Sequence, residues 1–363
     1  MKITQVEAIP LSIPFSFGGS AYRLGASARL ALDFCLVRVG TDDGLTGWGE
    51  AFAYSSRSAV VAAVRDMVAP LAIGQDAADI AGLGHKLQQS LHIFGRYGIT
   101  MHALSGLDIA LWDLAGKRAG KPLHQLLDGT PRATMPAYAS LLRYGDAALV
   151  AQYAARAVGE GFAAIKLHEI DETVVAAARA AVPGKIPLMF DVNCAWSLET
   201  AQPICARLAA HAPHWIEEPV FPPEDFAALK QVREHAGVPL AAGENWCTAM
   251  QFRHALDAGA VDIVQPSVTK VGGVSEFVKV AALARARGPA LALLRPRCDR
   301  HPAPADHAGR AGVVRTLLPR GRGGAVRRGI ETSQWRDDDS AGAGTRHRAR
   351  CGRDRALSDR LTC

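Results

Sequence analysis

The sequence lacks the features that mark membrane proteins, disulfide-stabilised proteins and zinc-binding proteins. No apolar run approaches the roughly 18 residues that cross a bilayer, and the opening MKITQVEAIPLSI alternates like a strand instead of forming the apolar stretch of a secretion signal. The seven cysteines are an odd number without CxxC spacing, which gives neither a disulfide framework nor a zinc site. The composition, 49% hydrophobic and 21% charged, is typical of a globular chain with a sizeable core. We expect a soluble, cytoplasmic protein with no membrane partner.

Lysine is absent from the last part of the chain. Residues 289–363 contain 16 Arg, no Lys and 8 acidic residues, whereas residues 1–288 carry 25 basic and 27 acidic residues. This Arg-rich segment holds one aromatic residue, Trp335, and shows no sustained helix or strand period. It could be a solvated, disordered extension. A nucleic-acid-binding tail would need more aromatic residues for base stacking, so we expect no nucleic-acid partner. We favour a third interpretation, in which GC-rich coding DNA is read out of frame from near codon 288.

Residues 1–128 have the pattern of a small α+β domain. The stretch 30–51, LALDFCLVRVGTDDGLTGWGEA, contains two apolar runs around a DDG turn, which predicts a hairpin. From 58 to about 127 the pattern becomes helical, with Gly120 as a helix stop. The glycine-rich stretch 15–25 has the composition of a mobile loop. Strands followed by helices predict an antiparallel sheet with helices packed on it.

Residues 129–288 repeat the order strand, turn, helix, which predicts a parallel sheet. Polar residues stand at the ends of successive strand candidates, with steps of 25, 26, 27 and 23 residues: Lys166, Asp191, Glu217, Glu244 and Ser267. Such even spacing favours a (β/α) barrel, in which the carboxyl ends of the strands converge on one site. A doubly wound sheet is the alternative, but no GxGxxG follows a first strand. Because the pattern stops at about Pro289, we expect an incomplete barrel.

Three acids at matching strand ends predict a metal site. Asp191, Glu217 and Glu244 would converge within a few ångströms, where three unpaired carboxylates repel one another. A divalent cation removes that repulsion, and hard oxygen ligands favour Mg²⁺. The alternative is that each acid pairs with a basic side chain or caps a helix. That alternative suits one such acid better than three at this spacing.

The strand before these acids carries two possible bases. Lys166 and His168, in AIKLHEI, are two residues apart on an apolar strand and so share a face. A lysine there can act as a base or hold a carboxylate, and a histidine titrates near neutrality. Taken singly, each is more simply a surface lysine or a core histidine. Together, one strand before the acids, they form the basic side of a candidate site.

These residues bring the chain close to a known family. It resembles the enolase superfamily, specifically the mandelate racemase and muconate lactonizing enzyme group, over about residues 1–288. The resemblance depends on several motifs together, and these are GLTGWGEA (44–51), LSGLDIALWDLAGKRAGKPLHQLLDG (104–129), FDVN (190–193), WIEEP (215–219), GENW (243–246) and KVGG (270–273).

The resemblance implies a fold, a cofactor and a reaction. The fold is a modified (β/α)7β TIM-type barrel with an N-terminal α+β capping domain. The family's ligands for Mg²⁺ fall on Asp191, Glu217 and Glu244, with Glu218 as a supporting carboxylate and Asn193 touching the site. The family reaction removes the proton α to a carboxylate, with Mg²⁺ stabilising the enediolate.

The chain departs from the family pattern on both sides of the site. The usual Lys-x-Lys is here Lys166-Leu167-His168, so we expect His168 to be the base and Lys166 to neutralise the carboxylate. On the opposite face stands Ser267 in place of an Asp or Lys, and no His lies within 291–297. Two-base racemisation is therefore disfavoured. Lys270 is interpreted as a supporting residue in place of a base, and we expect Lys270 and Asn193 to contact the substrate.

The predicted activity is dehydration of a sugar acid, an aldonate or aldarate. Racemisation, epimerisation and cycloisomerisation begin with the same enediolate and stay open, as does an inactive metal-binding protein without its last barrel strand. Tyr22 and Arg23, in the glycine-rich loop, are candidate substrate contacts, since an Arg can pair with a distal carboxylate. We also expect a homo-oligomer.

Overall fold

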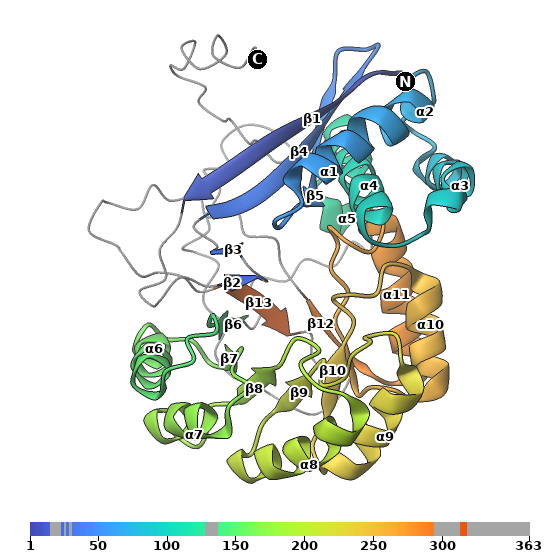
Figure 1. Ribbon diagram of the computed structural model, residues 1–363. Helices are drawn as coiled ribbons and strands as arrows, with labels where there is room; N and C mark the ends of the chain where they lie inside the picture. Colours follow the sequence, from blue (N-terminus) through green and yellow to red (C-terminus); the bar gives the residue numbers. More distant parts are fainter. Residues whose placement is uncertain (15–22, 25–26, 29–30, 128–136, 294–312, 318–363) are drawn as a thin grey trace.

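The computed structural model describes residues 1–14, 23–24, 27–28, 31–127, 137–293 and 313–317. Within these ranges, an antiparallel sheet with its helices packs against a closed barrel (Figure 1). The first unit is the cap, and the second is the barrel. The boundaries at 128 and 288 stay predictions.

The cap is built on a three-stranded antiparallel sheet. Its strands lie in the order β1 (Ile3–Pro14), β4 (Ala31–Thr41) and β5 (Thr46–Phe52). The hairpin predicted around the DDG turn is confirmed, since β4 and β5 pair from Phe34 opposite Phe52 to Gly40 opposite Thr46. A separate short pair joins β2 (Arg23–Leu24) to β3 (Ser27–Ala28). The helical segments of the cap are α1 (Arg57–Ala62), a π-helical turn (Ala63–Val68), α2 (Ala69–Ala72), α3 (Ile80–Ser90), a 3₁₀ turn (His92–Phe94), α4 (Gly98–Ala119) and α5 (Leu123–Leu127).

Helix α4 packs directly on the sheet because the motif TGWGEA places small residues beneath it. Along β5 the buried positions alternate, and two of them are Gly47 and Gly49. A Cβ atom at Gly49 would lie 2.0 Å from the carbonyl oxygen of Gly106 in α4. Glycine is therefore required for this close approach. The helix ends before Gly120, as the sequence predicts.

The barrel consists of seven parallel strands, each connected to the next by a helix that packs on its outside, and one antiparallel strand. This arrangement confirms the predicted (β/α) barrel over the doubly wound sheet. The parallel strands are β6 (Ala137–Ser140), β7 (Ile165–Leu167), β8 (Leu188–Asp191), β9 (Trp215–Glu217), β10 (Leu240–Ala242), β11 (Ile263–Val264) and β12 (Ala290–Leu293). The helices are α6 (Ala147–Gly159), α7 (Glu172–Ala181), α8 (Leu198–Leu208) with a 3₁₀ turn (Ala209–His211), α9 (Phe226–Ala236), α10 (Ala249–Ala258) and α11 (Gly273–Arg287).

Local sequence explains where these helices begin. Asp146, Asp171, Asp225 and Thr248 stand immediately before α6, α7, α9 and α10, and each side chain accepts a hydrogen bond from a backbone N–H of the first turn. Such N-caps satisfy donors that have no partner within the helix.

The barrel is closed, which differs from the predicted incomplete barrel. Strand β13 (Val313–Leu317) lies between β12 and β6 and pairs antiparallel with both. Its sequence, VVRTL, is a short run rich in β-branched residues inside the Arg-rich segment. A barrel removes the unpaired edges that two open strands would leave. Strand β12 (Ala290–Leu293) also lies in this segment, whereas residues 294–312 and 318–363 lie outside the described residues, and the out-of-frame interpretation stays a prediction.

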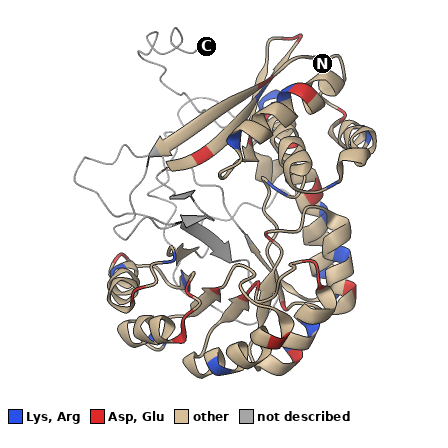
Figure 2. Ribbon diagram, viewed as in Figure 1, with Lys and Arg blue, Asp and Glu red and all other residues tan. Residues whose placement is uncertain are grey.

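Three hydrogen bonds join the cap helix α4 to the start of α11. The backbone N–H of Gly272 donates to Ser105 Oγ (2.8 Å), that of Ser275 donates to Asp108 Oδ2 (3.0 Å), and Trp112 Nε1 donates to Ser275 Oγ (3.0 Å). In Figure 2, acidic and basic residues are interspersed over the described helices, in keeping with the near-neutral balance of residues 1–288. Among the described helices, none is both long and apolar enough to cross a membrane.

Candidate active site

The barrel interior is arranged in two layers. Seven apolar side chains pack into one cluster inside the barrel, and these are Tyr138, Ala164, Met189, Trp215, Ala241, Ile263 and Ala292. Side chains two residues further along a strand share its face, and here they are polar or small: Ser140, Lys166, Asp191, Glu217, Gly243 and Gln265. The apolar layer therefore supports a polar layer at the carboxyl ends of the strands, where (β/α) barrels place their active sites.

Three carboxylates converge in this polar layer, as their spacing predicts. Asp191 and Glu217 are register partners on β8 and β9, and both are fully buried. Glu244 stands one residue beyond the layer, but Gly243 before it has φ +134°, a conformation that favours glycine and turns the chain. Carboxylate oxygens of the three acids lie within 4.8 Å of one another.

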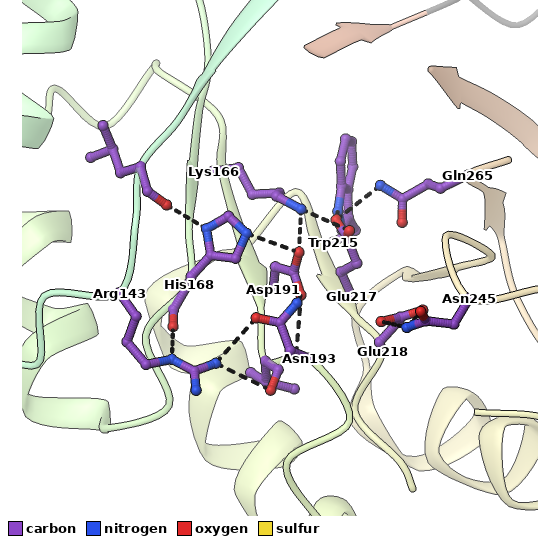
Figure 3. Close-up of polar contacts among 12 residues, drawn as sticks. Arg143, Lys166, His168, Asp191, Asn193, Trp215, Glu217, Glu218, Asn245 and Gln265 are labelled. Atoms are coloured by element: carbon purple, nitrogen blue, oxygen red, sulfur yellow. Dashed lines mark hydrogen bonds and ion pairs between the residues drawn. The ribbon is translucent and has the colours of Figure 1, made fainter. Parts of the chain in front are cut away.

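Lys166 and His168 both contact Asp191, and Lys166 also contacts Glu217 (Figure 3). Lys166 is fully buried, and its Nζ contacts Asp191 Oδ2 and, at 2.7 Å, Glu217 Oε1. His168 Nε2 lies 3.2 Å from Asp191 Oδ2, and its Nδ1 bonds to the carbonyl oxygen of Leu141. A carbonyl only accepts, so Nδ1 carries the proton and Nε2 faces the acids. The predicted basic side of the site is therefore in contact with the acidic side.

Asn193 links this centre to an arginine that the sequence reasoning missed. Asn193 Nδ2 donates to Asp191 Oδ1 at 2.7 Å, and its Oδ1 accepts from Arg143 Nη2 at 3.3 Å. Arg143 Nε also donates to the carbonyl oxygen of His168, so this side chain, just after β6, connects the ends of β6, β7 and β8 (Figure 3). The available signal was its place just after the apolar run MPAYASLL (135–142), which opens the strand, turn, helix pattern of the barrel.

A fourth carboxylate, Glu218, is also buried, with 1% of its surface exposed. Strict strand alternation predicts that only one acid of WIEEP faces inward, but Glu218 has φ +48° and leaves the strand conformation. Asn245 Nδ2 donates to both of its carboxylate oxygens, at 3.1 and 2.9 Å, and Lys270 Nζ donates to Asn245 Oδ1 at 2.9 Å. Burial first, and then the charges of the three neighbouring carboxylates, raise the pKa of Glu218 well above its usual value, and Lys270 opposes the rise.

Two further buried residues hold Glu217. Gln265 Nε2 donates to Glu217 Oε2 at 2.9 Å, and Trp215 Nε1 donates to the same oxygen at 3.2 Å. The sequence reasoning assigned Ser267 to the β11 strand end, but the layer position is Gln265, and Ser267 Oγ lies 3.3 Å from Thr269 Oγ1. The i+2 rule applied from Ile263 would have found Gln265.

The two cap-loop candidates are not placed at the site. Tyr22 lies outside the described residues, and of Arg23 only the backbone, in β2, is described. Their predicted contact with substrate stays a prediction.

The donor set suits a divalent cation. Four buried or partly buried carboxylates, Asp191, Glu217, Glu218 and Glu244, face two lysines, Lys166 and Lys270, so negative charge exceeds positive charge when all four are ionised. The raised pKa of Glu218 reflects that excess. Uncompensated buried charge is costly, and a doubly charged ion restores the balance. Carboxylate oxygens are the ligands that Mg²⁺ prefers. The residues present therefore fit Mg²⁺, which Asp191, Glu217 and Glu244 would hold.

Two family models match the chain. The model of the N-terminal domain of mandelate racemase / muconate lactonizing enzyme matches residues 22–128. The model described as enolase C-terminal domain-like matches residues 148–296. Between them the two matches cover the cap helices and the barrel from α6 to β12.

Curated and solved proteins are similar over most of their length. D-galactarolactone cycloisomerase from Agrobacterium fabrum is 35% identical over 302 residues, 79% of this chain and 77% of the relative. D-galactonate dehydratase from Ralstonia pickettii is 33% identical over 291 residues, 76% of this chain and 74% of the relative. The structure of a racemase from Streptomyces coelicolor A3(2) with bound magnesium has a TM-score of 0.74 at 32% identity, covering 80% of this chain and 82% of that one.

Proposed function

Because the chain belongs to the enolase superfamily, in its mandelate racemase and muconate lactonizing enzyme group, we propose that it removes the proton α to a sugar-acid carboxylate, with Mg²⁺ as cofactor. The observation that carries this proposal is the contact of Lys166 with Asp191 and Glu217, and of His168 with Asp191, beside a third carboxylate, Glu244, with oxygens of the three acids within 4.8 Å of one another. Bases and metal-binding acids are thus brought to one point of the barrel mouth.

His168 is the proposed base. The bond from Nδ1 to the carbonyl oxygen of Leu141 fixes the ring and places a proton on Nδ1, so Nε2 is the nitrogen left to exchange a proton with the substrate. When Nε2 takes the α proton, the imidazolium that forms lies 3.2 Å from Asp191 Oδ2, and the opposite charges attract. The distance and the tautomer both support proton transfer at Nε2.

Lys166 is proposed to hold the substrate carboxylate. Its ammonium group has three donors, and two of them point to Asp191 and Glu217. The third can bind a carboxylate oxygen of the substrate and orient the α carbon toward His168. When bound, Mg²⁺ supplies positive charge that stabilises the enediolate.

Dehydration of an aldonate or aldarate is the preferred reaction. The α C–H bond breaks, the proton passes to His168 Nε2, and the C–O bond to the 3-hydroxyl breaks as that oxygen is protonated and leaves as water. The remaining enol becomes a 2-keto-3-deoxy acid. The similarity to a D-galactonate dehydratase supports this choice.

Cycloisomerisation is the second candidate, because cycloisomerases are among the similar proteins. Besides the galactarolactone enzyme, a 3,6-anhydro-alpha-L-galactonate cycloisomerase from Streptomyces coelicolor is 36% identical over 268 residues. The same proton is removed, but the C–O bond that breaks belongs to a ring, so no water is released.

The test follows the α proton by NMR in D₂O. The full chain, with Mg²⁺ present, is incubated in three separate samples with D-galactonate, with galactarate and with D-galactarolactone. We expect loss of the α-proton signal with at least one acid, abolished by EDTA. His168→Asn is expected to lower the rate by about 100-fold or more. His211→Asn is the matched control, because His211 is a partly buried histidine on the outside of the barrel, bonded to Glu172.

The products separate the two candidates. A 2-keto-3-deoxy acid formed from D-galactonate or galactarate with loss of water identifies dehydration, and a keto acid formed from D-galactarolactone by ring opening, without loss of water, identifies cycloisomerisation. Binding of Mg²⁺ without exchange for any of these acids would contradict the proposal and favour an inactive metal-binding protein.

A further inference from the structure

Glu218 is placed where it can compete for the metal ion. It follows the proposed ligand Glu217, it is 1% exposed, and the neighbouring carboxylates act on its charge. Yet the oxygens that lie within 4.8 Å of one another belong to Asp191, Glu217 and Glu244, and not to Glu218. Figure 3 shows the Glu218 carboxylate against Asn245, apart from the contacts of Lys166. A specific contact must therefore hold the Glu218 carboxylate away from the three proposed ligands.

The amide of Asn245 holds Glu218, and Lys270 decides which way that amide points. An ammonium group can only donate, so Lys270 Nζ, at 2.9 Å, must face the amide oxygen. The NH₂ group is then left for both oxygens of Glu218, at 3.1 and 2.9 Å. The Asn245 side chain is solvent-exposed, so packing does not fix it and these hydrogen bonds do.

Lys270 is itself held from the cap. Its Nζ lies 4.7 Å from the centroid of the Phe52 ring, within cation–π range. The backbone N–H of Phe52 donates to the carbonyl oxygen of Thr269 at 3.2 Å. The Phe52 ring in turn meets His102 of α4 edge-on at 5.2 Å. Burial, and then the charge of Lys270, lower the pKa of His102 to about 3, so a neutral imidazole borders the lysine.

We propose that Lys270 is a positioning residue that, through Asn245, keeps Glu218 out of the coordination shell of the metal ion and so sets the preference for Mg²⁺. Mg²⁺ takes six ligands in a tight octahedron, whereas Ca²⁺ accepts six to eight oxygens in a looser shell. A freed Glu218 adds a fourth carboxylate, which favours the larger ion. Because Phe52 belongs to the cap and its ring contacts Lys270, the preference for Mg²⁺ depends on how the cap is placed. The inference rests on the proposed function, because it requires a metal ion at Asp191, Glu217 and Glu244.

The test is a calorimetric titration of the EDTA-treated full chain with MgCl₂ and with CaCl₂. In Lys270→Met we expect the ratio of Ca²⁺ to Mg²⁺ affinity to rise about tenfold or more, because a released Glu218 adds a carboxylate that the looser shell of Ca²⁺ accepts better than the octahedron of Mg²⁺. Asn245→Ala should have the same effect, and its exposed position keeps the fold intact if Lys270→Met fails to fold. Lys270→Arg, which keeps a donor, should restore the wild-type ratio.

Two further variants separate positioning from general effects. Lys279→Met is the matched control, because Lys279 is on α11, 62% exposed, and paired with Glu276; its ratio should equal that of the wild type. Phe52→Leu should shift the ratio in the same direction as Lys270→Met but by a smaller factor, and an unchanged ratio would refute the role of the cap.

The experiment distinguishes a failure of the positioning role of Lys270 from a failure of the proposed function. If the wild type binds Mg²⁺ and exchanges the α proton while Lys270→Met and Asn245→Ala keep the wild-type affinities for both ions, the positioning role is wrong and the proposed function stands. If the wild type binds neither ion, the proposed function fails and this inference with it.

Discussion

Asp108 should make the contact between cap and barrel sensitive to pH. It lies on α4, is 7% exposed, and accepts a hydrogen bond at 3.0 Å from the backbone N–H of Ser275 in the first turn of α11. Burial raises the pKa of Asp108 to about 6 from an ordinary 3.8, and hydrogen bonds from the start of α11 only partly offset this. Asp108→Asn keeps an acceptor for Ser275 and removes the titration.

The sign and size of the effect of Asp108 on stability follow from the linkage between proton binding and folding. A carboxyl group with a raised pKa holds its proton more tightly in the folded state, so its contribution to stability is fully present below pH 3.8 and is lost as the pH rises to about 6. The shift is roughly two pKa units, which corresponds to about 3 kcal/mol of unfolding free energy. Of this, about 2 kcal/mol should develop between about pH 4.5 and about pH 7.5.

The assay is urea unfolding of the wild type and Asp108→Asn across that pH range at constant ionic strength. The unfolding free energy of the variant, relative to the wild type, should rise by about 2 kcal/mol from the lowest to the highest pH. Asp171→Asn serves as the control, because the bond from the Thr173 backbone lowers the pKa of Asp171 below its ordinary 3.8, so this carboxylate stays ionised across the range and its difference from wild type should not change with pH. A difference between Asp108→Asn and wild type that stays constant with pH would refute the reasoning.

Two further substitutions test the charge balance and the packing of the cap. Lys166→Met leaves Asp191 and Glu217 without their buried cation, so we expect a loss of about 3–5 kcal/mol in urea unfolding without Mg²⁺ and a larger stabilisation by added Mg²⁺ than in the wild type; equal stabilisation in both would contradict the charge argument. Gly49→Ala places a Cβ atom 2.0 Å from a backbone oxygen of α4, so a loss of about 3 kcal/mol or more is expected from thermal unfolding, whereas Gly84→Ala in α3, with no atom within 4 Å, should be neutral or stabilising.

Strand alternation and the spacing between strands were enough to predict most of the acidic residues of the site. Asp191 and Glu217 lie exactly two residues beyond Met189 and Trp215 of the apolar layer, so periodicity alone places them in the same polar layer. Glu244 is one residue out of step, and the turn at Gly243 brings it in. A glycine at position 243 allows this backbone conformation, but the sequence alone does not show that the chain adopts it.

The contacts that the sequence left undetermined lie in loops and between domains. Glu218 is buried through a positive φ, and it meets Asn245 only because the loops after β9 and β10 lie side by side. Arg143 acts on residues 25 and 50 positions further along the chain. Helix and strand periodicity in the sequence does not predict contacts between residues so far apart along the chain. Strand β13 was missed because its residues gain partners only when the open edges of β12 and β6 are present.

The distribution of bases bears on which reaction the site supports. Lys166 and His168 both stand at the end of β7, whereas the segment just after β11, across the barrel, begins with the neutral Gln265 and Ser267, and Lys270 beyond them bonds to Asn245. Racemisation needs a proton donor on each face of the enediolate, because the proton leaves one face and returns to the other. Dehydration and cycloisomerisation need one base, whose proton can follow the departing oxygen. A one-sided site also returns solvent deuterium to the face that lost the proton, so any exchange before elimination should retain configuration at the α carbon.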